Sequence, residues 1–159
     1  MSTFEREGFK WRETYFVLFE AESRPTLKKI ERALLRLNSR FKLAAEQADS
    51  EGHFQSVTLL SPEDYAAIDI SYESGDEVLE QGAVLQNELS GCACDEDQRS
   101  QLARLPKLDA RFDVLHFEQT NGRDDADEML DPGALLLVLQ QLVDLTKGVG
   151  VDPQSGTLV

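Results

Sequence analysis

Apolar and polar positions follow two periods along the chain, one typical of β-strands and the other of α-helices. Residues 11–19, WRETYFVLF, are apolar on both alternating faces, which predicts a central strand in a sheet with covered sides. From Leu27 to Leu37 the apolar residues recur at intervals of three and four, so we expect an amphipathic helix. Pro25 is placed in the first turn of this helix, where proline is tolerated, and the helix should end near Asn38.

Three further strands are expected in the first half of the chain, at 41–48, 54–60 and 66–73. The first two flank the turn-rich stretch 49–53, so they are predicted to form a hairpin. The third alternates regularly between apolar and polar residues, as a half-buried strand does. The S-x-x-E spacing of a capping box then opens a helix over 74–89.

The second half of the chain begins with a short predicted helix over 95–105, which Pro106 closes. Residues 111–119, RFDVLHFEQ, predict another strand. The last helix is expected over 131–147, with Gly148 as its C-terminal cap. The tail beyond it has room for one edge strand.

Helices interleaved with hairpins predict an α+β fold, a two-layer sandwich with helices on one face of a mostly antiparallel sheet. Among such folds we expect a ferredoxin-like, split β-α-β arrangement. The length of 159 residues fits one domain of common size, and we find no repeat or linker, so 1–159 is expected to be a single domain.

The formal net charge of −14 argues against a general affinity for nucleic acid or for anionic membranes, because both are polyanions. No apolar run approaches the roughly 20 residues that cross a bilayer. The N-terminal stretch MSTFEREGFKW lacks the apolar core of a secretory signal. We therefore expect a cytoplasmic protein whose cysteines stay reduced.

The charge is distributed unevenly along the chain. Between Arg24 and Lys42 there are seven basic residues and one acid, Glu31, so this segment carries +6 and the remainder about −20. Four of the basic residues recur at helical spacing and are expected on one face: Lys29, Arg32, Arg36 and Arg40. This face is predicted to meet an acidic protein or an anionic small molecule. The alternatives are an RNA backbone, which the net charge disfavours, and a solvated face whose charges meet acids of the same chain or of a second copy.

Residues 91–97, GCACDED, hold both cysteines of the chain. Structural zinc needs four ligands, usually from paired C-x2-C or H-x3-H units, and C-x-C supplies only two. The metal candidates are therefore Cys92 and Cys94 together with His116, although a packed, hydrogen-bonded histidine is the favoured interpretation of His116. A thiol role lacks the usual C-x-x-C spacing, so a plain surface loop is favoured.

No catalytic motif is present, whether G-x-S-x-G, H-E-x-x-H or a phosphate-binding glycine loop, so no catalytic residue and no cofactor are assigned. The helix over 131–147 is apolar around almost its whole circumference, so it is either buried on all sides or contacts another chain. We predict a non-catalytic binding module that forms a homodimer through this helix. The alternative is a small metal-dependent or thiol-based enzyme that uses Cys92 or Cys94 with a histidine.

Overall fold

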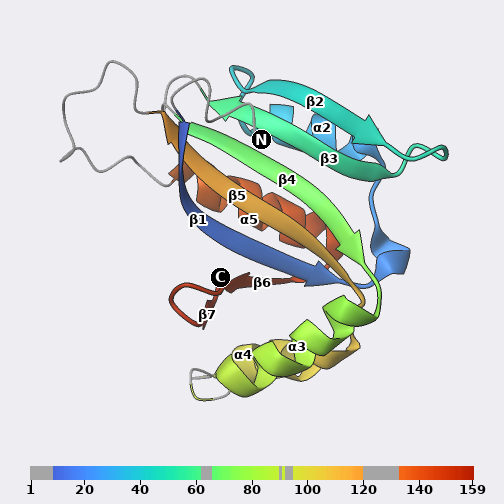
Figure 1. Cartoon of the computed structure of the whole chain (residues 1–159), viewed down its shortest axis with the longest axis vertical. Helices are drawn as coiled ribbons and strands as arrows, with labels where there is room; N and C mark the ends of the chain where they lie inside the picture. Colours follow the sequence, from blue (N-terminus) through green and yellow to red (C-terminus); the bar gives the residue numbers. More distant parts are fainter. Residues whose placement is uncertain (1–8, 62–65, 90, 92–94, 120–132) are drawn as a thin grey trace.

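An antiparallel sheet forms the centre of the structure. The computed structural model describes residues 9–61, 66–89, 91, 95–119 and 133–159 (Figure 1). Within these residues the sheet has seven strands in the order β2-β3-β4-β5-β1-β6-β7, and all neighbouring strands are antiparallel. In chain order they are β1 (Phe9–Phe19), β2 (Lys42–Ala48), β3 (Phe54–Ser61), β4 (Ala66–Ser74), β5 (Ala110–Gln119), β6 (Val149–Asp152) and β7 (Thr157–Leu158). Each strand expected from the sequence is present, and β1 lies inside the sheet, as its two apolar faces indicate.

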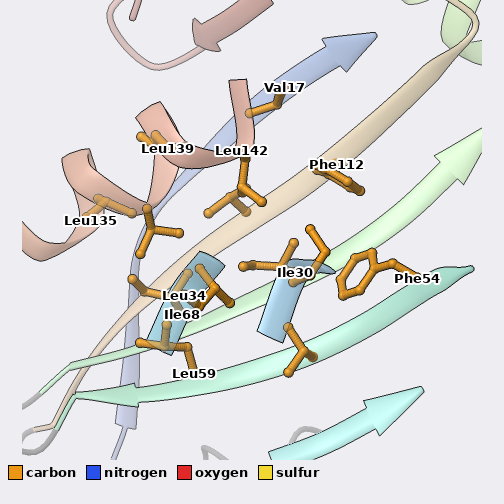
Figure 2. Packing of buried hydrophobic residues seen from close by; sticks show 14 of the residues in the cluster. Val17, Ile30, Leu34, Phe54, Leu59, Ile68, Phe112, Leu135, Leu139 and Leu142 are labelled. Atoms are coloured by element: carbon orange, nitrogen blue, oxygen red, sulfur yellow. The ribbon is translucent and has the colours of Figure 1, made fainter. Parts of the chain in front are cut away.

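Helices α2 (Leu27–Leu37) and α5 (Gly133–Thr146) cover one face of the sheet. Figure 2 shows side chains of both helices pointing toward those of the strands, with Ile30 of α2 and Leu142 of α5 near Phe112 of β5. These three side chains are completely buried. Burial of each such side chain contributes roughly 1.5–3 kcal/mol, so this cluster is the main source of stability on this face.

Helices α3 (Asp76–Leu89) and α4 (Glu96–Arg104) pack against the opposite face, at the end of the sheet formed by β1 and β6. A short 3-10 helix, η4 (Leu105–Lys107), follows α4 and contains the predicted stop at Pro106. A Cβ at Gly82 would collide with the backbone of Leu105, so glycine lets α3 approach η4 closely.

The described helices therefore lie on both faces of the sheet, and the prediction of helices on one face is wrong. The reason lies in β1: Val17 and Phe19 face α2 and α5, whereas Leu18 faces α3 and α4. The α+β class is confirmed. The strand order does not confirm the ferredoxin-like arrangement. Three consecutive antiparallel strands, β2, β3 and β4, lie between α2 and α3, whereas a β-α-β-β-α-β chain has two strands between its helices.

Helix α2 begins at Leu27, two residues after the start expected at Pro25. Its N-cap is Thr26, whose hydroxyl accepts a hydrogen bond from the Lys29 backbone N–H at 3.2 Å. Pro25 lies before the helix, where its carbonyl accepts from the Phe54 N–H of β3 at 3.0 Å. A 3-10 helix, η1 (Ala21–Ser23), precedes it. Pro25 thus joins α2 to the sheet instead of starting the helix.

Helix α5 ends in a turn formed by the two residues that follow it, Lys147 and Gly148. Lys147 has a φ of 54°, and the Gly148 N–H donates to the Val143 carbonyl at 3.1 Å, which is the Schellman pattern. A Cβ at Gly148 would collide with the Leu18 carbonyl of β1. The lysine therefore adopts the left-handed conformation expected of the glycine, and the glycine permits close contact with the sheet. The start predicted for this helix, at 131–132, lies outside the described residues.

Candidate partner-binding surface on helix α2

Helix α2 has one face in the core and one in solvent. Ile30 and Leu34 are completely buried. Lys29, Arg32 and Arg36 are exposed on the other side of the helix. We call these three residues the cation row. Their spacing of three and four residues places the three charges along about 10 Å of helix.

The cation row lacks an ion-pair partner within the described part of its own chain. Among the residues that the structure describes, none of Lys29, Arg32 and Arg36 forms an ion pair. This holds although the chain carries a net charge of −14. The alternative in which these cations meet acids of the same chain is therefore unsupported within the described part of the structure.

Arg40 is expected from the sequence to continue this row, but α2 ends before it, so Arg40 lies outside the helix that carries the other three cations. The helix ends at Leu37, and its C-cap Asn38 has an extended backbone. Arg40 is exposed and lies in the turn beyond, where its backbone N–H donates to the Asn38 side-chain oxygen at 2.9 Å. Helical spacing therefore does not place Arg40 with the other three.

Arg24 belongs to the same basic segment, and its charge is used inside the molecule. Its Nε and Nη2 donate to the Phe54 carbonyl at 2.9 and 2.7 Å, and its Nη1 lies 3.2 Å from an Asp49 carboxylate oxygen. The guanidinium also lies over the ring of Tyr72, 4.0 Å from its centre. Arg24 therefore joins β3 and β4 to the turn before β3 and is not part of the exposed surface.

The one acid of the basic segment, Glu31, is directed at another acid. A bulge in β2, where Ala45 has a φ of 52°, brings Glu46 into hydrogen-bond contact with Glu31. Burial and this neighbour raise the pKa of Glu31, because two adjacent carboxylates repel each other. Lys28 also acts on Glu31, in the opposite direction. Glu31 is thus directed at Glu46, and among the described residues it forms no ion pair with the cation row.

The end of the cation row borders a hollow of about 300 Å³ between α2 and the end of α5. Lys29 and Lys147 line it, together with Arg24 and Glu22. Since Arg24 is paired with Asp49, the two lysines are the cations that this hollow offers to a small anion.

His116 is one of the metal-ligand candidates expected from the sequence. His116 is buried in β5, with Nδ1 3.3 Å from a carboxylate oxygen of Glu13 in β1. Burial lowers the pKa of His116, and burial together with Glu13 raises the pKa of Tyr15 to about 12. His116 is thus the packed, hydrogen-bonded histidine that the strand pattern favoured.

Cys92 and Cys94 lie outside the described residues, so the metal and thiol roles stay predictions. Among the side chains that the structure does describe, no group of three or more His, Cys, Asp or Glu residues is arranged to hold a metal ion.

Helix α5 is neither buried on all sides nor fully exposed. Leu135, Val138, Leu139 and Leu142 are buried, whereas Leu136 and Leu137 are 47% and 53% exposed. The described part of this helix thus buries one face and leaves apolar residues at its N-terminal end in solvent.

Sequence reasoning missed an acidic surface on α3. Residues 73–97 contain eight acids and no Lys, Arg or His, which is the signal that would have found it. Four of these acids are exposed on α3, and we call them the acid row: Asp76, Glu77, Glu80 and Glu88. None of them forms an ion pair with a residue in the described ranges. Figure 1 shows α2 and α3 at opposite ends of the molecule.

Comparison of the chain with protein-family models, with curated proteins and with solved structures finds no match. No helix in the described ranges combines the length and the apolar character needed to span a membrane. The function is therefore inferred from geometry and charge.

Proposed function

We propose that this protein is a non-catalytic binding module whose cation row captures an acidic segment of a partner protein. The observation that carries the proposal is the exposure of Lys29, Arg32 and Arg36 without an ion pair among the described residues, in a chain with a large excess of acids. An exposed ion pair contributes at most about 1 kcal/mol to stability, and an exposed charge without a partner contributes less. The stability of the fold therefore does not account for the row. A segment rich in carboxylates supplies the missing counter-charges.

The two arginines favour a carboxylate partner. A guanidinium presents parallel N–H donors that match the two oxygens of one carboxylate, and such bidentate pairs are stronger than contacts to a single charge. Arg32 and Arg36 are one helical turn apart, so they can hold two carboxylates on neighbouring turns of a peptide.

Nucleic acid is a poorer partner for the same surface. A polynucleotide extends far beyond a row about 10 Å long, and its other phosphates would meet the remaining charge of about −20. A short acidic peptide is confined to the row and avoids this repulsion.

An anionic small molecule, the other ligand expected from the sequence, would lie in the hollow beside Lys29 and Lys147. Two features there disfavour an anion. Glu22 lines the same hollow, and the carboxyl end of α5 contributes partial negative charge. The exposed row is therefore the better site, and an acidic protein segment the better ligand.

Binding of an immobilised polyglutamate peptide tests the proposal. We expect the wild-type protein to bind this probe at low salt and to release it as the salt concentration rises, because exposed charges are screened. Arg32→Glu/Arg36→Glu should bind at least about tenfold more weakly than the wild type, which corresponds to about 1.4 kcal/mol.

The matched control is Arg99→Glu/Lys107→Glu, which changes the net charge by the same amount on two exposed residues of α4 and η4. Its affinity should stay close to that of the wild type. An equal loss in the two variants would mean that only the total charge matters, and the cation row would then not be the binding surface.

Two finer parts of the sequence interpretation stay predictions. The homodimer through the helix over 131–147 draws support from the exposure of Leu136 and Leu137, and the cytoplasmic location rests on the sequence alone. No observation specifically favours the enzyme built on Cys92, Cys94 and a histidine.

A further inference from the structure

The exposed faces of α2 and α3 each carry charged side chains next to one apolar side chain, and the charges of the two helices are opposite in sign. On α2, Lys28, Arg32 and Leu35 share one face at spacings of four and three, and all three are exposed. On α3, Glu77, Glu80 and Val84 share one face at spacings of three and four, and all three are exposed. Each helix therefore presents two like charges followed, within one turn, by an apolar side chain.

The two apolar side chains are exposed on the outer faces of their helices. Leu35 is 42% exposed and Val84 is 53% exposed, although each lies on a helix whose opposite face is buried in a core cluster. Protein interfaces commonly combine an apolar centre with a polar rim. Leu35 among cations and Val84 among acids provide the two halves of such a contact.

These two surfaces cannot meet within one molecule. Figure 1 shows α2 beside β2 and β3 at one end of the structure, and α3 beyond the other end of the strands. Helix α2 packs against α5 and the sheet, and α3 packs against η4 and α4. The complementary faces can therefore pair only between two copies of the chain.

We propose that the acidic partner of the cation row is helix α3 of a second copy, so that copies associate head to tail. This inference rests on the proposed function, because it names the segment that the cation row captures. In the contact, Arg32 and Arg36 of one copy pair with Glu77 and Glu80 of the next, and Leu35 packs near Val84.

The contact is weak and depends on salt. Two copies with a net charge of −14 repel each other, but this repulsion is screened beyond about 8 Å at physiological ionic strength, whereas directly apposed charges attract. One helix against one helix buries less than the roughly 1,200 Å² of a stable interface, so a transient association is expected. Because the two surfaces differ, each copy at the end of such an assembly keeps one unused surface, so further copies can add and form an open chain or a closed ring.

Sedimentation velocity over a range of protein concentrations provides the first test. The wild type should associate with rising concentration at low salt, and high salt should return it to the monomer. Arg32→Gln/Arg36→Gln and Glu77→Gln/Glu80→Gln should each associate at least about tenfold more weakly. Wild-type protein that stays monomeric at low salt would overturn the inference.

A mixture of the two glutamine variants provides the decisive test. The first variant keeps the acid row and the second keeps the cation row, so an equimolar mixture has one intact contact. We expect a complex of one copy of each, with no larger species. Oligomers that persist in both variants alone would show that another surface, such as exposed Leu136 and Leu137, joins the copies, and would overturn the inference.

Binding of polyglutamate by the same samples separates this inference from the proposed function. If the wild type stays monomeric but binds polyglutamate through Arg32 and Arg36, only the head-to-tail contact is wrong. If the wild type neither associates nor binds polyglutamate, both are wrong. If it does both, polyglutamate should also dissociate the oligomers, because the peptide and α3 compete for one row.

Discussion

Arg24 and Arg32 belong to one basic segment, and the structure uses them in opposite ways. Arg24 has a side chain 18% exposed, donates to the Phe54 carbonyl, pairs with Asp49 and lies over Tyr72. Arg32 is exposed on α2 and forms no ion pair with any residue of the described ranges. The first arginine holds parts of the fold together, whereas the second is free to contact another molecule.

The difference shows why the composition of a basic segment does not by itself define a binding surface. A charge that the chain has already paired and partly buried cannot be exposed to a partner without breaking the fold. A charge on the outer face of a helix has no such constraint. The functional candidates are therefore the cations that the fold leaves unpaired.

Among the changes that test this comparison, removal of the Arg24 side chain should reduce the free energy of unfolding the most. Arg24→Met should reduce the free energy of unfolding by about 2–4 kcal/mol, because the Phe54 carbonyl and the Asp49 carboxylate lose their donor in a partly buried site. Urea unfolding followed by circular dichroism measures this loss.

Arg24→Lys is the control, since it keeps the charge but lacks the parallel donors of the guanidinium. It should lie between the wild type and Arg24→Met. If Arg24→Met unfolds at the same urea concentration as the wild type, the contacts of Arg24 do not stabilise the fold and the comparison fails.

The sequence could indicate the cation row and not the role of Arg24, for a physical reason. Lys29, Arg32 and Arg36 share a face because of the helical repeat, which is a local property and visible in the sequence. The Phe54 carbonyl that binds Arg24 is thirty residues away along the chain, and only the folded sheet brings it near. Periodicity holds no information about such distant pairs.

The fold likewise has features that local sequence patterns predict and features that they do not. The order and approximate limits of the strands and helices were predicted, because each depends on a short repeating pattern. The position of β1 between β5 and β6 was not, because strand pairing depends on contacts across the whole chain. The two apolar faces of β1 indicated that both sides are covered, but not that α3 and α4 cover one of them.

A smaller expected effect is the pH dependence of stability that comes from the buried His116. The pKa of His116 is lowered by burial, so below about pH 6.5 the unfolded chain binds a proton that the folded protein does not. Stability should therefore fall as the pH decreases from about 6.5 toward the lowered pKa of His116, by at most about 1.4 kcal/mol per pH unit.

His116→Gln isolates this contribution, because glutamine can still donate to Glu13 and does not titrate. The variant should lose less stability than the wild type when the pH is lowered through this window in urea unfolding experiments. Equal slopes for the two proteins would show that His116 is as easily protonated in the folded protein as in the unfolded chain.

The smallest expected effect is on the stability of the variant that should lose binding. Arg32→Gln/Arg36→Gln removes two exposed charges that no described residue pairs with, so the free energy of unfolding should change by no more than about 0.5 kcal/mol. Thermal and urea unfolding of this variant beside Arg24→Met measure the contrast directly. A loss similar to that of Arg24→Met would mean that the cation row supports the fold after all, and any loss of binding in the charge-changed variants would then reflect unfolding. An unchanged stability would instead assign that loss to the surface itself, because the helix carrying it would be intact.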